Sequence, residues 1–254
     1  MTAAPSGKPR VSVLIPAYNE ERLIGAVLAS VHASFAECRE TTYEVIVCDN
    51  NSTDHTAEVA RANGAQVVFE PHNQISRARN TAAAKASGEW FIFLDGDTQL
   101  NPGLLRETLG ALASGKMSGG GTTIEFDRGN LGPFAHGLIW LWNWISATFH
   151  LAAGSYLFCL GEAWKEVGGF AEDIYAGEEL FFSRKVKSWG KQRGLRFRVL
   201  SKSPIVTSAR KMEWYGQWEL LKHVLLMMHP TAMKRREACS LWYTRPPSTT
   251  KAGE

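Results

Sequence analysis

The chain has 254 residues, of which 44% are hydrophobic and 21% charged, and its formal net charge is +3. This length suits one large α/β domain, or one domain with a short appended segment, and allows a core that needs no disulfides. The small positive charge gives no argument for nucleic acid as a partner. No two cysteines are spaced closely enough for a zinc-type pair, and the four are Cys38, Cys48, Cys159 and Cys239. A reducing compartment fits this pattern, so we expect a cytoplasmic protein.

Strand-like and helix-like patterns alternate over the first hundred residues. Strands are predicted at 11–15, 43–48, 67–69 and 90–94, and helices at 23–31, 54–63 and 75–87, with another beginning at Asn101 and Pro102. Such alternation is typical of an α/β fold, in which a mostly parallel sheet carries helices on both faces. Ligands of these folds bind beyond the carboxyl ends of the strands. The sequence therefore predicts a crevice at that edge.

Polar residues follow three of these strands. They are Tyr18, Asn19 and Glu20 after the first, Asp49, Asn50 and Asn51 after the second, and Asp95 and Asp97 after the fourth. Two carboxylates around a glycine suit Mg²⁺ or Mn²⁺, which stabilises the charge that a leaving diphosphate develops. Asp49 is placed to accept a hydrogen bond from a nucleobase or a ribose. Solvated turns and helix capping, by Asn19 for example, are the alternative explanations.

Two arginines, Arg77 and Arg79, lie in the first turns of the helix predicted over 75–87. Basic groups beside a cleft neutralise a diphosphate, whereas the same residues on a solvated helix face need no ligand. The sequence leaves both explanations open.

Several runs together resemble the family 2 glycosyltransferases. They are VSVLIPAYNE, VIVCDNNSTDHT, ISRARNTAAAKASGEWFIFLDGD and GGFAEDIYAGEEL, which lie within about residues 10 to 200. The resemblance implies the GT-A fold, the α/β nucleotide-diphospho-sugar transferase fold, with a mixed, mostly parallel central sheet flanked by helices. It also implies inverting transfer of a sugar from a nucleotide-diphosphate donor, with uridine favoured, and a divalent metal, Mn²⁺ or Mg²⁺.

The resemblance implies roles for individual residues. The implied donor-binding residues are Pro16, Tyr18, Glu20, Asp49, Arg79 and Asp95, and the implied metal ligand is Asp97. Family members carry Glu-Asp where this chain has Glu178 and Glu179, and the second acid is the expected catalytic base. Glutamate also accepts protons, so we expect Glu179 to be the base, with Glu178 as the alternative. Arg210 and Lys211 are candidate contacts to the leaving diphosphate.

The expected organisation has four parts. They are a disordered lead-in over 1–9, a GT-A catalytic domain over 10–210, a helical segment over 211–244 and a flexible tail over 245–254.

The stretch from Gly129 to Gly161 contains no Asp, Glu, Lys or Arg but does contain three tryptophans. A core helix, an acceptor pocket lined by tryptophan and a segment at a membrane interface all fit. A helix predicted over 214–228, followed by three basic residues, either packs on the domain or rests on an anionic membrane. We therefore expect peripheral contact with the inner face of the membrane as one alternative, with an acceptor hydroxyl on a lipid or a glycan.

Three other protein classes are weighed against a glycosyltransferase. A nucleotide-sugar-binding protein with impaired catalysis would explain the glutamate at position 179. A nucleotidyltransferase would need a glycine-rich, basic loop after the first strand, where this chain has PAYNE. A Rossmann dehydrogenase would need GxGxxG there, and the chain has none.

Overall fold

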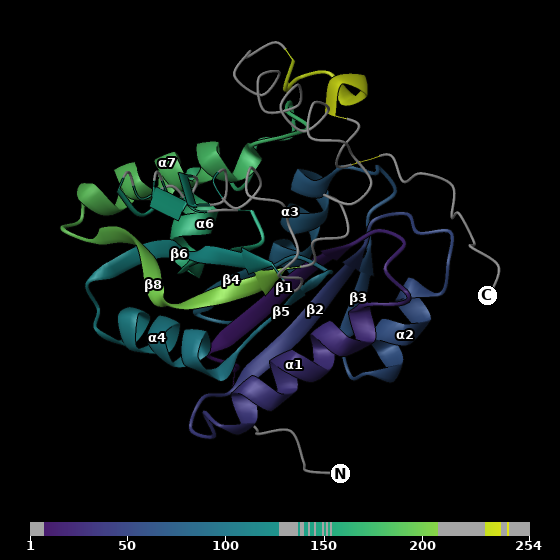
Figure 1. The fold of residues 1–254 in the computed structure, drawn as a ribbon, viewed down its shortest axis with the longest axis horizontal. Helices are drawn as coiled ribbons and strands as arrows, with labels where there is room; N and C mark the ends of the chain where they lie inside the picture. Colours follow the sequence, from purple (N-terminus) through teal and green to yellow (C-terminus); the bar gives the residue numbers. More distant parts are fainter. Residues whose placement is uncertain are drawn as a thin grey trace.

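The computed structural model describes residues 8–126, 137, 140–141, 143–144, 146–148, 150, 152, 154–207, 232–239 and 243. Over these residues the centre of the molecule is an eight-stranded sheet with the order β3-β2-β1-β4-β7-β6-β8-β5 (Figure 1). The strands are β1 (Val11–Ala17), β2 (Tyr43–Asp49), β3 (Gln66–Phe69), β4 (Trp90–Leu94), β5 (Thr98–Gln99), β6 (Met117–Phe126), β7 (Tyr156–Leu160) and β8 (Arg196–Thr207).

The sheet is mixed, as expected. Strand β1 pairs in parallel with β2 on one side and β4 on the other, and β3 extends this parallel half beyond β2. Strand β7 then runs antiparallel to β4 and to β6, while β8 is parallel to β6 and antiparallel to β5. Strand β1 is almost continuously apolar because helices cover both of its faces.

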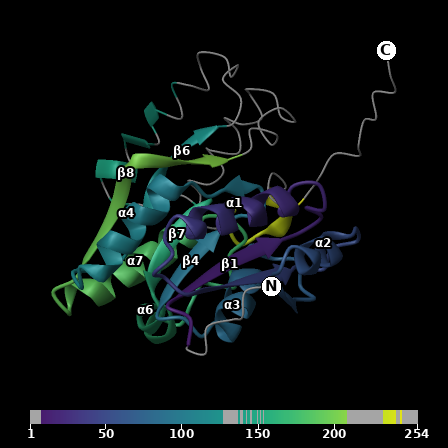
Figure 2. The same cartoon turned by 90° about the horizontal axis from the view of Figure 1, so that it is seen from below.

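Helices form a layer on each side of the sheet. They are α1 (Ile24–Ala36), α2 (Thr56–Ala62), α3 (Ile75–Lys85), α4 (Pro102–Ala113), α6 (Gly161–Val167) and α7 (Glu178–Lys191), with a 3₁₀ turn, η1, at Arg236–Cys239. Helices α1, α2 and α4 cover one face, and α3, α6 and α7 cover the other (Figure 1; Figure 2 gives the view from the α1 side). Each face has its own buried cluster, with Val13 and Ile15 of β1 in one and Leu14 in the other.

The predicted start of α4 is confirmed. The Asn101 side chain accepts a hydrogen bond from the Leu104 N–H at 2.8 Å, and Pro102 occupies the first turn. This cap satisfies one backbone donor that the helix itself leaves unpaired.

Some elements of the structure were not predicted, and some predictions fall outside the described residues. Strands β5, β6 and β7 and helix α6 have no counterpart among the predicted elements. The predicted helix over 214–228 lies outside the described residues, as do Arg210 and Lys211. Within the described part of the chain, each helix is too short or too polar to cross a bilayer.

Candidate functional site

The carboxyl ends of β1, β2 and β4 meet at one edge of the sheet. Ala17, the last residue of β1, pairs with Asp49, the last residue of β2. The Asp95-Gly96-Asp97 turn after β4 packs directly against the end of β1, where a Cβ on Gly96 would lie 3.1 Å from the Pro16 carbonyl oxygen. The predicted crevice edge is therefore formed by these three turns.

The turns after β1 and β2 are joined by hydrogen bonds. The Asn19 N–H donates to Ser52 Oγ at 3.0 Å, and the Thr53 N–H donates to Asn19 Oδ1 at 2.8 Å. The Glu20 N–H donates to Thr56 Oγ1 at 2.7 Å. The suggestion that Asn19 caps α1 is wrong, because α1 begins at Ile24 without a side-chain cap and the Asn19 amide binds the neighbouring turn instead.

Asp49 and Asn50 organise the second turn. Asp49 is buried, and its Oδ1 accepts from the Ser52 N–H at 3.0 Å. The Asn50 amide donates to the His72 carbonyl oxygen at 2.6 Å and accepts from the Gln74 N–H at 2.8 Å. The turn after β2 is thus fixed to the segment that leads into α3.

A cavity of about 530 Å³ opens beside these turns. Its lining combines two phenol rings, several amides and two arginines, and consists of Tyr18, Asn51, Thr53, Pro71, His72, Asn73, Gln74, Arg77, Glu172, Tyr175 and Arg236. This volume is within the range of small-molecule sites in proteins. Of the predicted donor-binding residues, Tyr18 is the one that lines the cavity.

Arg236 is a cavity residue that no sequence motif indicates. It follows the catalytic segment by many residues, yet its Nη2 donates to Asn73 Oδ1 at 2.9 Å and its guanidinium lies 5.5 Å from the Tyr243 ring centre. From the sequence, the basic run around it is explained by a membrane contact or by packing on the domain, and neither explanation brings it to this cleft.

A buried arginine connects the acidic residues of the site. Arg79 of α3 pairs through Nη1 with Glu178 at 2.8 Å and through Nη2 with Asp95 at 2.9 Å. Its Nη2 also donates to the Gly154 carbonyl oxygen at 2.8 Å. Only 3% of the Arg79 side chain is exposed, so these partners compensate a charge that burial would otherwise make costly. The implied contact of Arg79 with a nucleotide stays a prediction.

Glu179 lies beside this pair. A Cβ on Gly154 would be 3.3 Å from Glu179 Oε1 and 3.6 Å from Arg79 Nη2, so all three residues are neighbours. Burial, reinforced by the charge of Glu178, raises the pKa of Glu179 to about 8. Burial also raises the pKa of Glu178, although Arg79 opposes the shift. A carboxylate whose pKa lies near neutrality is suited to general base catalysis.

The acidic turn after β4 offers carboxylate oxygens, the ligand type that Mg²⁺ and Mn²⁺ prefer. Asp95 and Asp97 flank Gly96, and Asp97 Oδ1 accepts from Thr98 Oγ1 at 3.4 Å. Among the described residues, no three His, Cys, Asp or Glu side chains gather as a complete metal site. Mg²⁺ and Mn²⁺ sites at diphosphates typically need only one or two carboxylates, because phosphate oxygens and water complete the shell, so these residues fit.

The structure thus gathers Arg79, Asp95, Glu178 and Glu179 in one cluster. Pro16 and Glu20 adjoin it through Gly96, since a Cβ there would lie 3.5 Å from Glu20 Cγ. Asp49 lies in the neighbouring turn. The roles predicted for these residues remain predictions.

The fold and the arrangement of acids at the strand ends define a GT-A nucleotide-sugar transferase fold. The model of the family "Glycosyl transferase family 2" matches residues 12–163, which is more than half of the chain. The protein therefore belongs to glycosyltransferase family 2.

Relatives of the chain are also named glycosyltransferases. An uncharacterized glycosyltransferase of Mycobacterium tuberculosis is 34% identical over 132 residues, which cover 52% of this chain and 53% of the relative. Glycosyltransferase AglE of Haloferax volcanii is 29% identical over 193 residues, which cover 72% of this chain and 62% of that protein. The chain therefore spans about half the length of the mycobacterial relative.

Solved structures share the fold at low identity. A mannosyltransferase from Pyrobaculum calidifontis in complex with GDP-Man and Mn²⁺ has a TM-score of 0.67 at 20% identity, covering 92% of this chain and 65% of that one. Glucosyl-3-phosphoglycerate synthase from Mycobacterium tuberculosis, in complex with Mn²⁺, UDP-Glc and phosphoglyceric acid, has a TM-score of 0.58 at 20% identity, covering 96% and 83%.

Proposed function

We propose that the protein is an inverting glycosyltransferase that moves a sugar from a nucleotide-diphosphate donor, UDP-linked, to an acceptor hydroxyl. The observation that carries the proposal is the position of Glu179. A half-buried carboxylate with a raised pKa lies beside the Arg79–Asp95 pair, at the sheet edge that also borders a cavity of about 530 Å³. Family membership supports the activity.

The cavity is the proposed site for the nucleoside of the donor. Tyr18 offers a ring face to a base, Asn51 and Thr53 offer polar groups to a ribose, and Arg77 and Arg236 offer positive charge to phosphate. The solved neighbours were crystallised with UDP-Glc and GDP-Man, so uridine and guanosine are both represented among proteins of this fold.

Asp97, with Asp95, is the proposed holder of Mn²⁺ or Mg²⁺. The solved neighbours with Mn²⁺ support the choice of a divalent ion. When bound, such an ion neutralises negative charge on the leaving diphosphate.

The proposed reaction is a single in-line displacement at the anomeric carbon. The acceptor oxygen forms a bond to that carbon as the bond from carbon to the diphosphate oxygen breaks, and the diphosphate leaves with the electron pair. Glu179 takes the proton of the acceptor hydroxyl. Arg79 holds Glu178 at 2.8 Å and Asp95 at 2.9 Å, which keeps the acids in place before the substrates arrive.

A thermal-shift screen of nucleotide sugars with and without Mn²⁺, followed by transfer assays with the best donor, tests this proposal. A sugar-nucleotide donor should raise the melting temperature, and Mn²⁺ should enlarge the rise. Stabilisation by a donor without any hydrolysis or transfer would instead support a binding protein with impaired catalysis. No stabilisation by any nucleotide sugar would contradict the proposal.

A further inference from the structure

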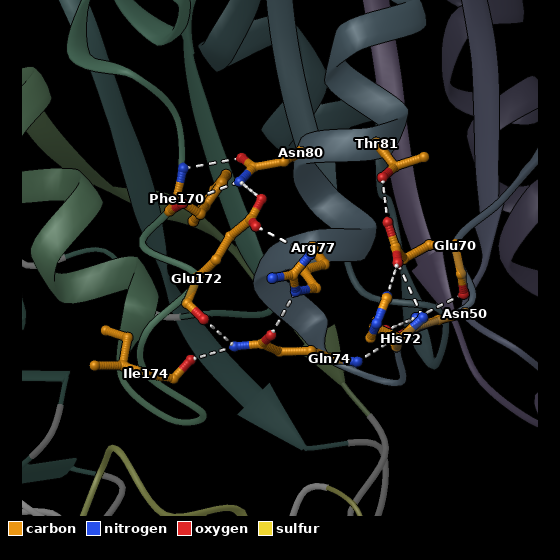
Figure 3. Close-up of polar contacts among 10 residues, drawn as sticks. All are labelled: Asn50, Glu70, His72, Gln74, Arg77, Asn80, Thr81, Phe170, Glu172 and Ile174. Atoms are coloured by element: carbon orange, nitrogen blue, oxygen red, sulfur yellow. Dashed lines mark hydrogen bonds and ion pairs between the residues drawn. The ribbon is translucent and has the colours of Figure 1, made fainter.

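The loop over residues 168–177 joins α6 to α7 and ends directly before Glu178 and Glu179. It has three glycines with positive φ, at 168, 169 and 177. Glycine carries a large conformational entropy in a free chain, so this loop needs contacts to hold one conformation. Figure 3 shows that side chains of α3 and of the residue before it supply those contacts.

Asn80 binds the first part of the loop. Its Nδ2 donates to the Phe170 carbonyl oxygen and to Glu172 Oε1, both at 3.0 Å, and its Oδ1 accepts from the Phe170 N–H at 2.9 Å (Figure 3). Gly169 allows this approach, because a Cβ there would lie 2.5 Å from Asn80 Oδ1. The nitrogen and the oxygen of the Asn80 side-chain amide therefore both bind the loop.

Gln74 binds the second part of the loop. Its side chain is buried, and its Nε2 donates to the carbonyl oxygens of Glu172 and Ile174, both at 2.9 Å. Gln74 Oε1 accepts from Arg77 Nε at 3.1 Å, and Arg77 also pairs with the Glu172 carboxylate at 3.3 Å (Figure 3). Gln74, Arg77 and Glu172 line the cavity as well. The residues that fix the loop are thus part of the cavity wall.

Helix α3 also holds the residue that follows the loop, because its Arg79 pairs with Glu178 at 2.8 Å. Helix α3 and the residue before it, Gln74, therefore fix the loop at Phe170, at Glu172 and Ile174, and at the start of α7. The contacts of Gln74 and Asn80 with the loop do not include Glu179 itself. Gln74 and Asn80 therefore influence the position of Glu179 through the backbone of the loop that leads to it.

We propose that Asn80 and Gln74 are positioning residues, which fix the 168–177 loop on α3 and thereby set the place of Glu179 relative to the donor cavity. The inference rests on the proposed function. Because a displacement of about 1 Å in a reacting group can cost ~10²-fold in rate, loosening the loop should lower turnover without removing any catalytic group.

Asn80→Asp is the sharpest test, since it keeps the size and the oxygen that accepts from Phe170. It loses both donated hydrogen bonds and places a carboxylate against the Phe170 carbonyl and Glu172. We expect kcat to fall about 10-fold or more, while the donor Kd changes little. Hydrogen exchange measured by mass spectrometry should become faster across the loop.

Thr81→Val is the matched control on the same helix. It removes the hydrogen bond from Thr81 Oγ1 to Glu70 Oε2 at 2.8 Å, which lies away from the loop (Figure 3). This variant should keep wild-type kcat and wild-type exchange in the loop.

Glu172→Gln added to Asn80→Asp supplies an amide that can donate to the carboxylate introduced at position 80, so the double variant should recover part of the lost kcat.

Gln74→Met gives an independent second variant of similar size. Because Gln74 also lines the cavity, this change should lower kcat and weaken donor binding together.

If Asn80→Asp folds and shows loop exchange and kcat equal to those of Thr81→Val, the inference is wrong. If Asn80→Asp does not fold, the same two readouts on Gln74→Met decide it. If the wild-type protein transfers no sugar, the proposed function fails, and the hydrogen-exchange comparison still decides whether these residues fix the loop.

Discussion

Glu179 is the residue whose chemistry the proposed reaction needs most. Its carboxylate lies next to Gly154 and Arg79, in surroundings that raise its pKa to about 8. Two features of this group, its basicity and its burial, lead to separate predictions.

Glu179→Gln should lower kcat by about 10²-fold or more, since the amide keeps the shape of the side chain but accepts no proton. The donor Kd from calorimetry should stay near the wild-type value. Glu162→Gln, at an exposed position on α6, is the control for the same chemical change. Normal turnover of Glu179→Gln would show that Glu179 is not the base.

The pH dependence follows from the raised pKa of Glu179. Burial is the largest cause of the raised pKa of Glu179, the charges of Glu178 and Asp95 add to it, and the charge of Arg79 opposes it. The base must be ionised to act, so kcat/KM should rise with pH through about 8.

The raised pKa of Glu179 affects stability in the opposite direction: it lowers the free energy of unfolding as pH rises. Between the unfolded pKa of about 4.5 and the folded pKa of about 8, the native protein binds more protons than the unfolded chain, so Glu179 contributes a loss of stability as pH rises. The Tm of Glu179→Gln relative to wild type should therefore increase from pH 5 to pH 8, about the window between the two pKa values. A Tm difference that does not change with pH would contradict the raised pKa of Glu179.

The sequence motifs indicate which acidic residues belong to the site but not which residues they pair with. Asp95, Asp97 and the two glutamates can be named because carboxylates at strand ends and before a helix are readable as patterns. Arg79 is expected at the nucleotide, whereas the structure pairs it with Glu178, 99 positions away. Sequence spacing carries no information on such a contact.

Among the elements, β6 shows why periodicity fails in the middle of the chain. Its sequence, MSGGGTTIEF, has three consecutive glycines, which disfavour a strand on propensity. They are required by packing: a Cβ on Gly119 would lie 2.6 Å from the Phe158 carbonyl oxygen, and one on Gly120 would overlap the Arg198 carbonyl oxygen. The neighbouring strands β7 and β8 leave no room for a side chain at these positions, and the local sequence of β6 gives no sign of that requirement.

The described residues of 137–148 are helical and present large apolar side chains to solvent. Trp140 is 68% exposed, Leu141 43% and Trp144 53%. Of the three explanations for this stretch, exposure favours an interface segment over a core helix, because tryptophan is suited to the membrane surface. The interface explanation predicts that these residues bring the protein to a lipid surface.

Sedimentation with anionic lipid vesicles tests the membrane contact. The wild-type protein should pellet with vesicles, and Trp140→Ala combined with Trp144→Ala should pellet less. Phe69→Ala is the control, since Phe69 is also an exposed aromatic residue, 57% accessible, on edge strand β3. A wild-type protein that stays in the supernatant at low salt would exclude this contact.

For the whole molecule, binding of the donor should raise the free energy of unfolding. The cavity is bordered by the turns after β1 and β2, the segment between β3 and α3, α3 itself, the 168–177 loop and η1, so a bound donor would contact parts far apart in the sequence. A donor at 100 times its Kd should add about 2.7 kcal/mol to the free energy of unfolding if it binds only the native protein. Equilibrium denaturation with and without donor measures this gain, and an unchanged midpoint would contradict a folded-state donor site.

Sequence patterns alone predict the α/β class, the parallel half of the sheet, the family and the acids at the strand ends. These follow from local patterns, namely apolar runs, helix periodicity and motifs within a few residues, whose meaning does not depend on distant parts of the chain. The folded chain is needed to see that Arg79 joins Asp95 to Glu178, that Asn80 and Gln74 bind the loop before the glutamates, and that Arg236 lines the cavity. These contacts join residues 16 to 163 positions apart. Such pairs form because packing of both faces of the sheet brings their elements together, and no local pattern encodes that proximity.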